Sequence, residues 1–312
     1  MENEHEQGKG LTRREFLSAG IVGGAAIILT QNLPAATTQK VKKTDVWVFH
    51  GKDKKKLMNA CLKVISDNGG FGKGAKKLTL KVNAAWYRTP EQGANTHPEL
   101  VDAFLVGCKK MGIKQVVMPE HSCDDPRKSF PRSGLLQVAQ KNGAKMYSLG
   151  GNRKLYKEVK IPKGKRLKKA LVGKDFLETD ALVNIPVAKH HGSARLSIAM
   201  KNWMGAVRDR GYWHRNNLHQ CIADFSTFIK PTWTIIDATR IMLDRGPKGP
   251  ARNLKHPNLI ILSRDQVAAD AYASTLFPGV GPTKVGYLKI AREMKIGTTE
   301  VSKMAVHKIE VS

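Results

Sequence analysis

The chain has 312 residues, of which 41% are hydrophobic and 25% charged, so it can bury a core for one large or two small domains and disorder throughout is excluded. Its 28 glycines and 14 prolines follow no fixed period, which excludes collagen-like and repeat architectures, and its 4 cysteines are too few for a disulfide scaffold. The 53 Lys and Arg against 26 Asp and Glu give a formal net charge of +27.

The first recognisable segment resembles a twin-arginine export signal. The run TRREFL (12–17) precedes an uncharged stretch, 18–30, that is too short to span a bilayer comfortably. We therefore expect residues 1–36 to be a signal segment and the protein to be periplasmic or extracytoplasmic. Because residues 34–36 lack a clean A-x-A pattern, an uncleaved segment acting as a membrane tether is an alternative. This export route is known for carrying folded proteins, often with a cofactor, so the resemblance implies a bound prosthetic group.

The positive charge belongs to the rest of the chain, because residues 1–36 hold three cations and four anions. It is concentrated in the lysine-rich runs 52–56, 73–77 and 160–169. These runs are scattered and have few interleaved aromatic residues, so they indicate solvated surface and not a nucleic-acid interface. For an exported protein, the anionic partners we expect are lipid headgroups, acidic redox proteins and small anionic molecules.

Short strands alternate with helices through the first half of the mature chain. The capping box at Thr96 and Glu99, with Pro98 in the first turn, predicts a helix that begins after Thr96. The predicted order is strand 45–49, helix 53–67, strand 78–83, helix 97–111, strand 115–118, helix 135–141 and strand 145–149. Such alternation is typical of an α/β protein with a doubly wound, mostly parallel sheet.

The second half resumes this pattern after a lysine- and proline-rich stretch, 151–174, which we expect to be a surface hairpin or insertion. A long polar segment reaching residue 217 follows the next strand. The predicted elements are strand 181–185, helix 218–228, strands 234–237 and 259–262, and helices 266–276 and 284–294. Residues 37–312 form one α/β domain on this interpretation, either with sub-lobes 44–150 and 175–312 around a cleft or with a single sheet.

Polar residues gather where the predicted strands end, which is where open α/β sheets bind ligands. They are Asn83, the run EHSCDD (120–125), the run KHH (189–191) and Asp237. The run 120–125 is a second candidate ligand set or a solvated loop.

The densest group of candidate side chains lies between residues 180 and 224. We expect His190, His214 and His219 to bind a transition metal or to act as acid–base groups. Lys189 and Lys201 are the expected anion or cofactor holders. The expected site also includes Asn202 and His97. We expect a carboxylate, Asp224 or Asp237, to orient an imidazole.

No spacing in this group is diagnostic of one chemistry, because HExxH is absent and each histidine alone is equally compatible with a structural role. Cys61, Cys108 and Cys221 fit core positions. Without a CxxC motif we expect no iron–sulfur cluster bound by this chain alone. The glycine-rich run 69–74 precedes a strand, so it fits a turn and not a phosphate-binding loop.

Motifs along the chain, most of them in its second half, together resemble the domain-of-unknown-function 362 family, over about residues 78–296. The most specific are Lys189-His190 and Lys201-Asn202-x-x-Gly205. The others are THPE (96–99), DFLETD (175–180), DRGYWH (209–214), the residues Leu218, His219 and Asp224, then Asp237, RGP (245–247) and DQVAAD (265–270). The resemblance implies a ferredoxin-like or membrane redox partner.

A more distant resemblance is to lactate racemase, in which a lysine anchors a nickel pincer nucleotide. Lys201 would be the analogous lysine, with SIAM (197–200) in place of a glycine pair. The sequence thus favours an exported protein with a cationic cleft that binds a metal or a metal-containing organic cofactor for redox or isomerase chemistry. Two alternatives are a non-enzymatic protein that binds or delivers a metal or cofactor to a membrane redox complex, and a basic anion or polyanion binder.

Overall fold

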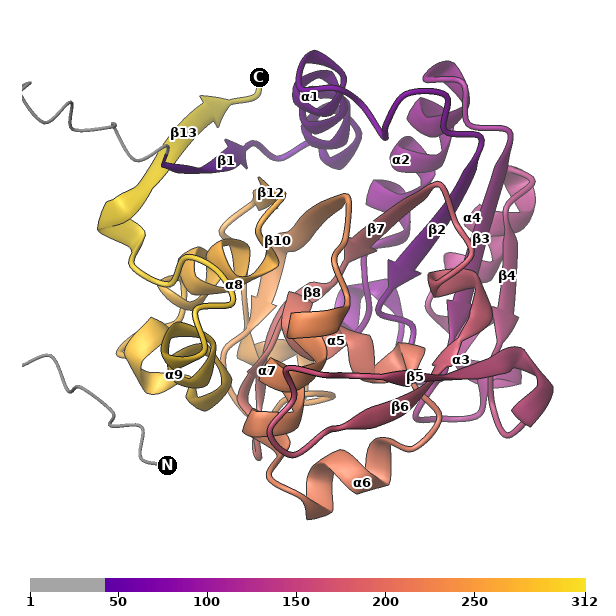
Figure 1. Cartoon of the computed structure of the whole chain (residues 1–312). Helices are drawn as coiled ribbons and strands as arrows, with labels where there is room; N and C mark the ends of the chain where they lie inside the picture. Colours follow the sequence, from indigo (N-terminus) through magenta and orange to yellow (C-terminus); the bar gives the residue numbers. More distant parts are fainter. Residues whose placement is uncertain (1–42) are drawn as a thin grey trace, which may run out of the picture. The chain divides into compact units, whose positions relative to one another are not determined.

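Runs of β-branched and aliphatic residues build one large sheet in the computed structural model, which describes residues 43–312. Its central strands follow the order β13-β1-β12-β10-β7-β2-β3-β4 (Figure 1). These strands are β1 Thr44–His50, β2 Lys77–Val82, β3 Gln115–Glu120, β4 Lys145–Ser148, β7 Ala181–Ile185, β10 Trp233–Met242, β12 Leu259–Ser263 and β13 Met304–Glu310. The short strands β8 Val187–His191 and β11 Leu254–Lys255 pair with β10, and β9 Arg195–Ser197 pairs with β8.

The sheet is mixed but mostly parallel. Strands β4, β3, β2, β7 and β10 run parallel to one another, whereas β12 is antiparallel to both β10 and β1. Strands from residues 44–150 and from residues 175–312 therefore share one sheet. The expected α/β class with a mostly parallel sheet is confirmed.

Helices cover both faces of this sheet. Leu57, Phe104 and Leu135 of the first group of helices pack with Leu80 and Ile260 of the sheet, which forms one hydrophobic core. The second core lies on the other face and joins the remaining helices to the sheet. The first group is α1 Lys54–Asp67, α2 Pro98–Lys110 and α4 Leu135–Lys141, and the second is α5 Ala199–Asn202, α7 Leu218–Phe228, α8 Gln266–Ser274 and α9 Gly286–Glu293 (Figure 1).

The fold also contains two further short helices and one hairpin. The helices are α3 Pro126–Arg132 and α6 Arg210–Arg215. Strands β5 Tyr156–Lys160 and β6 Lys169–Gly173 form a separate two-stranded antiparallel sheet within the segment 151–174. The hairpin is joined to the rest of the fold by a bridge between Val172 and Val207.

The predicted capping box of helix α2 is wrong. His97 is the N-cap, and its Nδ1 accepts a bond of 3.2 Å from the backbone amide of Glu99. The Thr96 hydroxyl is buried instead between two strand ends, where it accepts from Asn83 N at 2.8 Å and donates to Ile185 O at 2.7 Å. A hydroxyl that ties two strands together is not free to cap a helix.

The sequence pattern also failed to predict several strands and helices that the structure contains. Strands β8 and β9 and helices α5 and α6 lie in the stretch expected to be polar and irregular, and β13 is absent from the prediction. These elements, apart from β13, have three to six residues, too few to establish a period. Within residues 43–312, no helix combines the length and apolarity needed to cross a membrane. The expected twin-arginine segment lies outside the described residues.

Candidate functional site: a cationic cavity

A cavity of about 280 Å³ lies beyond the carboxyl ends of β2 and β3, beside β8 and α5. This is the edge of a parallel sheet at which ligands are expected. The lining residues are Asn83, Ala85, Trp86, Glu120, His121, Cys123, Lys189, His191, Ser197, Lys201, Asn202, Met204, Gly205, Arg210, His214 and Pro247.

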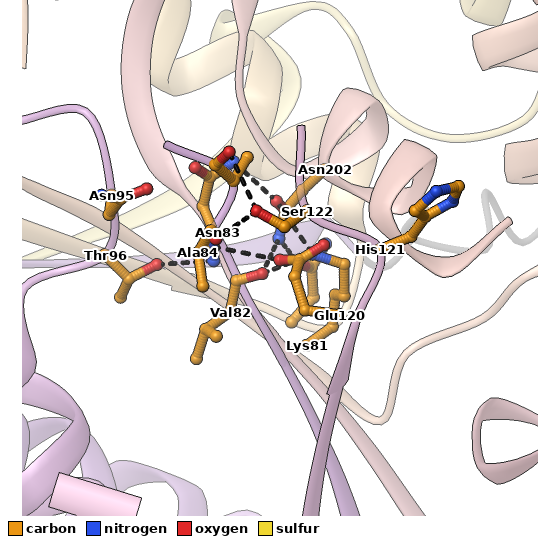
Figure 2. Close-up of polar contacts among 12 residues, drawn as sticks. Lys81, Val82, Asn83, Ala84, Asn95, Thr96, Glu120, His121, Ser122 and Asn202 are labelled. Atoms are coloured by element: carbon orange, nitrogen blue, oxygen red, sulfur yellow. Dashed lines mark hydrogen bonds and ion pairs between the residues drawn. The ribbon is translucent and has the colours of Figure 1, made fainter. Parts of the chain in front are cut away.

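The floor of the cavity is a buried polar network centred on Glu120 (Figure 2). The Lys81 ammonium lies 2.8 Å from Glu120 Oε2, and both side chains are almost fully buried. Glu120 Oε2 also accepts a bond of 3.1 Å from the backbone amide of Ala84. Asn202 Oδ1 joins the network by accepting from Lys81 at 3.3 Å and from Asn83 Nδ2 at 3.0 Å. The negative charge of Glu120 is therefore neutralised by Lys81 and does not balance the other cations of the cavity.

The alternation of strand β8 directs two side chains into the cavity, Lys189 and His191. The buried Lys189 ammonium donates to Asn83 Oδ1 at 3.0 Å and to the Ala94 carbonyl. Burial, reinforced by the nearby Lys201, lowers the pKa of Lys189 to about 7. Burial and the same lysine lower the pKa of His191 to about 3, so this imidazole is neutral at physiological pH.

Lys201 faces the cavity from the short helix α5. The buried carboxyl of Asp270 holds the start of that helix by accepting from Ala199 N at 2.7 Å and from Met200 N at 3.0 Å. Among residues 43–312, no group accepts a hydrogen bond from the Lys201 ammonium or forms an ion pair with it. Burial lowers the pKa of Lys201 to about 8. The Lys201 side chain is therefore available to contact a molecule bound in the cavity. Near neutral pH it is present both as the ammonium cation and as the neutral amine.

The rim of the cavity is built by Arg210, the first residue of α6. Its guanidinium donates to the carbonyls of His121 and Ser122 at 2.8 and 3.0 Å, and lies 3.1 Å from Cys123 Sγ. Cys123 is the exposed member among the four cysteines. A positive charge thus lies at the mouth beside a solvent-accessible thiol.

Four of the residues expected from the sequence line this cavity. Lys189, Lys201 and Asn202 lie at its inner surface, and the exposed His214 lies at its mouth. His190 does not line it. Because it is on the opposite face of β8 from Lys189, its Nδ1 accepts instead from Gly246 N at 3.1 Å.

His219 and Asp224 lie in other surroundings on helix α7. His219 stacks on Tyr287 with ring centroids 6.3 Å apart. Asp224 is buried, and its Oδ2 accepts from the backbone amides of Arg166 and Leu167 at 2.7 and 2.8 Å. The contacts of Asp224 attach the loop between β5 and β6 to the domain, and orient no imidazole.

His97 and Asp237 form a second cluster with Arg240. Asp237 is buried, pairs with Arg240 Nη1 at 2.6 Å, and accepts from the backbone amide of His97 at 2.9 Å. Burial and the Arg240 charge lower the pKa of His97 to about 4. Arg240 also donates to Asn95 O at 2.9 Å. The cluster therefore supports the loop whose Ala94 carbonyl contacts Lys189, and lies outside the cavity lining.

The donor set does not fit a metal ion held by side chains of this chain alone. No group of three or more His, Cys, Asp or Glu in the described part of the chain is placed to hold one. His190, His214 and His219 do not line one site: His190 lies on the face of β8 opposite to Lys189, His214 lies on α6 at the cavity mouth, and His219 stacks on Tyr287 from α7. The cations around the cavity fit an anionic organic group instead.

Of the lining residues, Trp86 was not expected from the sequence, whereas Glu120, His121, Cys123, His191 and Arg210 were candidates only as members of larger polar runs and had no assigned role. For Glu120, His121 and Cys123 a signal was present, since they end or follow a strand and form the second candidate set. Lys81, which neutralises Glu120 from below, carries no such signal, because a lysine within a strand usually indicates a solvent-facing position.

The family model described as "Domain of unknown function (DUF362)" matches residues 78–275, which is more than half of the chain. The chain belongs to the DUF362 family. All the residues that line the cavity fall within the DUF362 match, as do Lys81 and Asp270.

A curated relative of this DUF362 protein is a thylakoid-associated protein of Synechocystis sp., which is 21% identical over 222 residues. The match covers 68% of this chain and 66% of the relative, so the chain spans about two thirds of the relative's length.

Two solved structures are similar to this chain at 13% identity. One is a protein of Thermotoga maritima, with a TM-score of 0.48 over 73% of this chain and 60% of that one. The other is the lactate racemase apoprotein of Thermoanaerobacterium thermosaccharolyticum, with a TM-score of 0.49 over 76% of this chain and 57% of that one.

Proposed function

We propose that this DUF362 protein binds a small anionic organic molecule, a cofactor or a substrate, in the cavity between β2, β3, β8 and α5. The observation that carries the proposal is the charge balance of the lining. Lys189, Lys201 and Arg210 face a space of about 280 Å³ whose one lining carboxylate, Glu120, is already paired with Lys81. An anionic guest would supply the missing negative charge, and the buried setting strengthens its attraction to the lysines.

The same groups support proton-transfer chemistry on the guest. Ammonium groups with pKa values of about 7 and 8, as for Lys189 and Lys201, exchange protons readily near neutral pH. Beside them, His191 is neutral, and its Nδ1 accepts a hydrogen bond of 3.2 Å from the backbone amide of Ala194, so its Nε2–H can donate a hydrogen bond to the guest. We therefore infer isomerase-type or redox chemistry assisted by an organic cofactor, with the ammonium groups as acid–base groups.

A metal would come to this cavity as part of the organic cofactor. Lys201, Lys189 and Arg210 would hold the anionic portion of such a cofactor, and the metal would supply Lewis-acid or redox chemistry when bound. The non-enzymatic alternative uses the same residues to store or deliver the cofactor without turnover.

We also propose that the protein is exported and that it has a redox partner. Arg13-Arg14 and the uncharged stretch 18–30 support transfer across the membrane by the twin-arginine route. The name of the Synechocystis relative, a thylakoid-associated protein, supports association with a membrane. We propose that a ferredoxin-like or membrane redox protein exchanges electrons with the exported protein.

The test combines mass spectrometry with a binding measurement. The full chain, purified from its host's exported fraction, is weighed in native and denaturing conditions to detect a retained organic group. Pyrophosphate is then titrated calorimetrically into the protein freed of that group, into Lys201→Met, and into the control Lys73→Met. Lys73 is exposed and outside the cavity, so both variants lose one positive charge.

We expect Lys201→Met to weaken pyrophosphate binding at least tenfold, the effect of removing one charge-assisted contact, while Lys73→Met binds like the native protein. Equal binding by all three proteins, together with the absence of a retained group, would contradict the proposal. Turnover of a cofactor-loaded protein would then separate an enzyme from a storage or delivery protein.

A further inference from the structure

The segment 153–174, which holds the β5–β6 hairpin, carries an exceptional share of the positive charge. It has ten Lys or Arg residues against one acidic residue, Glu158. All ten are exposed: Arg153, Lys154, Lys157, Lys160, Lys163, Lys165, Arg166, Lys168, Lys169 and Lys174. We call this segment the cationic hairpin. Its net charge is a third of that of the whole chain, and none of its residues lines the proposed site.

The charges of the cationic hairpin are left largely unpaired. Lys169 contacts Glu158 at 3.3 Å, and within residues 43–312 it is the one cation of the hairpin that forms an ion pair. Lys160 and Lys169 stand directly opposite each other across the two strands. Like charges at such positions destabilise a strand pair. An external anionic surface would relieve this repulsion.

The loop that carries much of this charge is held in place by buried contacts. Asp224 accepts hydrogen bonds from the amides of Arg166 and Leu167, and Ile161 N donates to Lys168 O at 2.8 Å. Ile161 and Leu167 are buried in the core of the domain. The lysines at positions 163, 165 and 168 are therefore presented from a fixed backbone, which reduces the loss of entropy on binding.

The composition of the surface favours a lipid partner over a protein partner. Eight of the ten cations are lysines, and the aromatic residue of β5, Tyr156, is buried. Protein interfaces are depleted of lysine and enriched in exposed aromatic residues, whereas the described residues expose Tyr87 and Val106 as their large hydrophobic side chains, both outside the hairpin. A bilayer of anionic lipids requires only clustered positive charge. We propose that the cationic hairpin binds the surface of an anionic lipid bilayer.

This binding would bring the rim of the cavity to the membrane surface. Strand β6 reaches the rim through the bridge from Val172 to Val207 and through a bond of 2.9 Å from Arg208 N to Leu171 O. Arg210, two residues further on, lines the cavity. A guest from a membrane-bound partner would thus have a short path to the proposed site.

The test measures partition of the full chain onto sedimented vesicles. Vesicles of phosphatidylcholine with 30 mol% phosphatidylglycerol, about the range of natural anionic membranes, are compared with pure phosphatidylcholine at roughly 0.1 and 0.5 M salt. The hairpin variant is Lys163→Gln/Lys165→Gln/Lys168→Gln. The matched control is Lys73→Gln/Lys110→Gln/Lys114→Gln, three exposed lysines far along the chain from the hairpin. Both variants lose three charges and keep residues 1–42 unchanged.

We expect the hairpin variant to lose about 100-fold in partition onto the anionic vesicles, since each basic residue near such a surface contributes about fivefold. The control should lose far less, and binding should weaken sharply at high salt. Unchanged melting temperatures would show that both variants fold. Lys201→Met should bind the vesicles like the native protein, which separates this proposal from the cavity function.

Three outcomes would overturn the assignment. Equal losses in the two triple variants would show that net charge alone drives binding. Equal partition onto neutral vesicles would show that charge is not involved. Tighter, hairpin-dependent binding to a DNA duplex or to an acidic protein such as a ferredoxin, at the same salt, would replace the bilayer by that partner.

Discussion

Lys81 and Glu120 form an ion pair of 2.8 Å beneath the cavity, with side chains only 1% and 2% exposed. Because the pair neutralises itself, the carboxylate of Glu120 is not available to balance Lys189, Lys201 and Arg210 above it. The positive character of the cavity is therefore a consequence of Lys81, which lies behind the lining and neutralises its one carboxylate.

Breaking this pair should destabilise the fold. Glu120→Gln leaves the Lys81 ammonium buried without a counter-charge, and we expect the free energy of unfolding in urea to fall by about 3 kcal/mol. Glu178→Gln, at an exposed position, is the control and should change it little. In Lys81→Met/Glu120→Gln much of the loss should be recovered, because no charge is then buried alone. A double variant as unstable as the single one would contradict this explanation.

The buried lysines Lys189 and Lys201 contribute stability that increases with pH between about 8 and 10. An unfolded lysine keeps its proton up to about pH 10.4, whereas Lys189 and Lys201 have folded pKa values of about 7 and 8. At these two lysines the unfolded chain therefore binds more protons in this window, so their contribution to the free energy of unfolding increases with pH. The buried thiols of Cys61, Cys108 and Cys221, whose pKa values burial raises, act in the opposite direction above about pH 8.5. The contribution of the lysines is therefore read from the difference between the native protein and Lys189→Met. Asp270, whose burial raises its pKa to about 8, has the opposite effect only below that pH.

This pH dependence is measured by urea unfolding at intervals across the window. Lys189→Met should show a smaller slope than the native protein. Affinity for pyrophosphate should change in the opposite direction and fall as pH rises from 7 to 9, because the cations are lost. A native slope retained in Lys189→Met would show that other groups produce it.

Cys123 is predicted to be the thiol that reacts in the folded protein. It is exposed at the cavity mouth, whereas Cys61 and Cys108 are buried, which raises the pKa of both thiols. Burial also raises the pKa of Cys221 to about 11. Iodoacetamide followed by peptide mass spectrometry should therefore find one modified site in the native protein and four in denaturant.

Pyrophosphate bound in the cavity should slow this alkylation, because Cys123 lines the same space as Lys201. Lys201→Met provides the control, since protection should be lost with binding. Early modification of Cys61 or Cys108 in the native protein would argue against the described burial.

Asp224→Ala should destabilise the hairpin and leave ligand binding in the cavity unchanged. The change removes the acceptor of the Arg166 and Leu167 amides, so we expect a loss of stability of about 2 kcal/mol and faster tryptic cleavage in the loop 161–168. Asp224→Asn keeps one acceptor oxygen and should be milder. Pyrophosphate affinity should stay unchanged at a temperature where the variant is folded; a large loss of affinity would restore the catalytic role expected from the sequence.

Much of the fold follows from local patterns in the sequence. Helix 218–228 was predicted at the bounds of α7, and strand 181–185 at those of β7, because each is long or buried enough for its hydrophobic pattern to be complete. The capping of α2 was mispredicted, since the Thr96 hydroxyl serves strand ends that are distant in the sequence. Part of the cavity was predictable from local pattern as well, because Lys189 follows the predicted strand 181–185 and Glu120 ends strand β3.

The amino-acid sequence by itself determined the class of fold, the excess of positive charge and the edge of the sheet where polar groups collect. These properties depend on composition and on short periodic patterns. Only the tertiary structure decided which of those groups meet: β8 turns Lys189 and His191 into the cavity and His190 away, and Asp224 supports a hairpin instead of an imidazole. The physical reason is that pairing and burial depend on contacts between residues tens to hundreds of positions apart, such as Lys81 with Asn202, which no local pattern encodes.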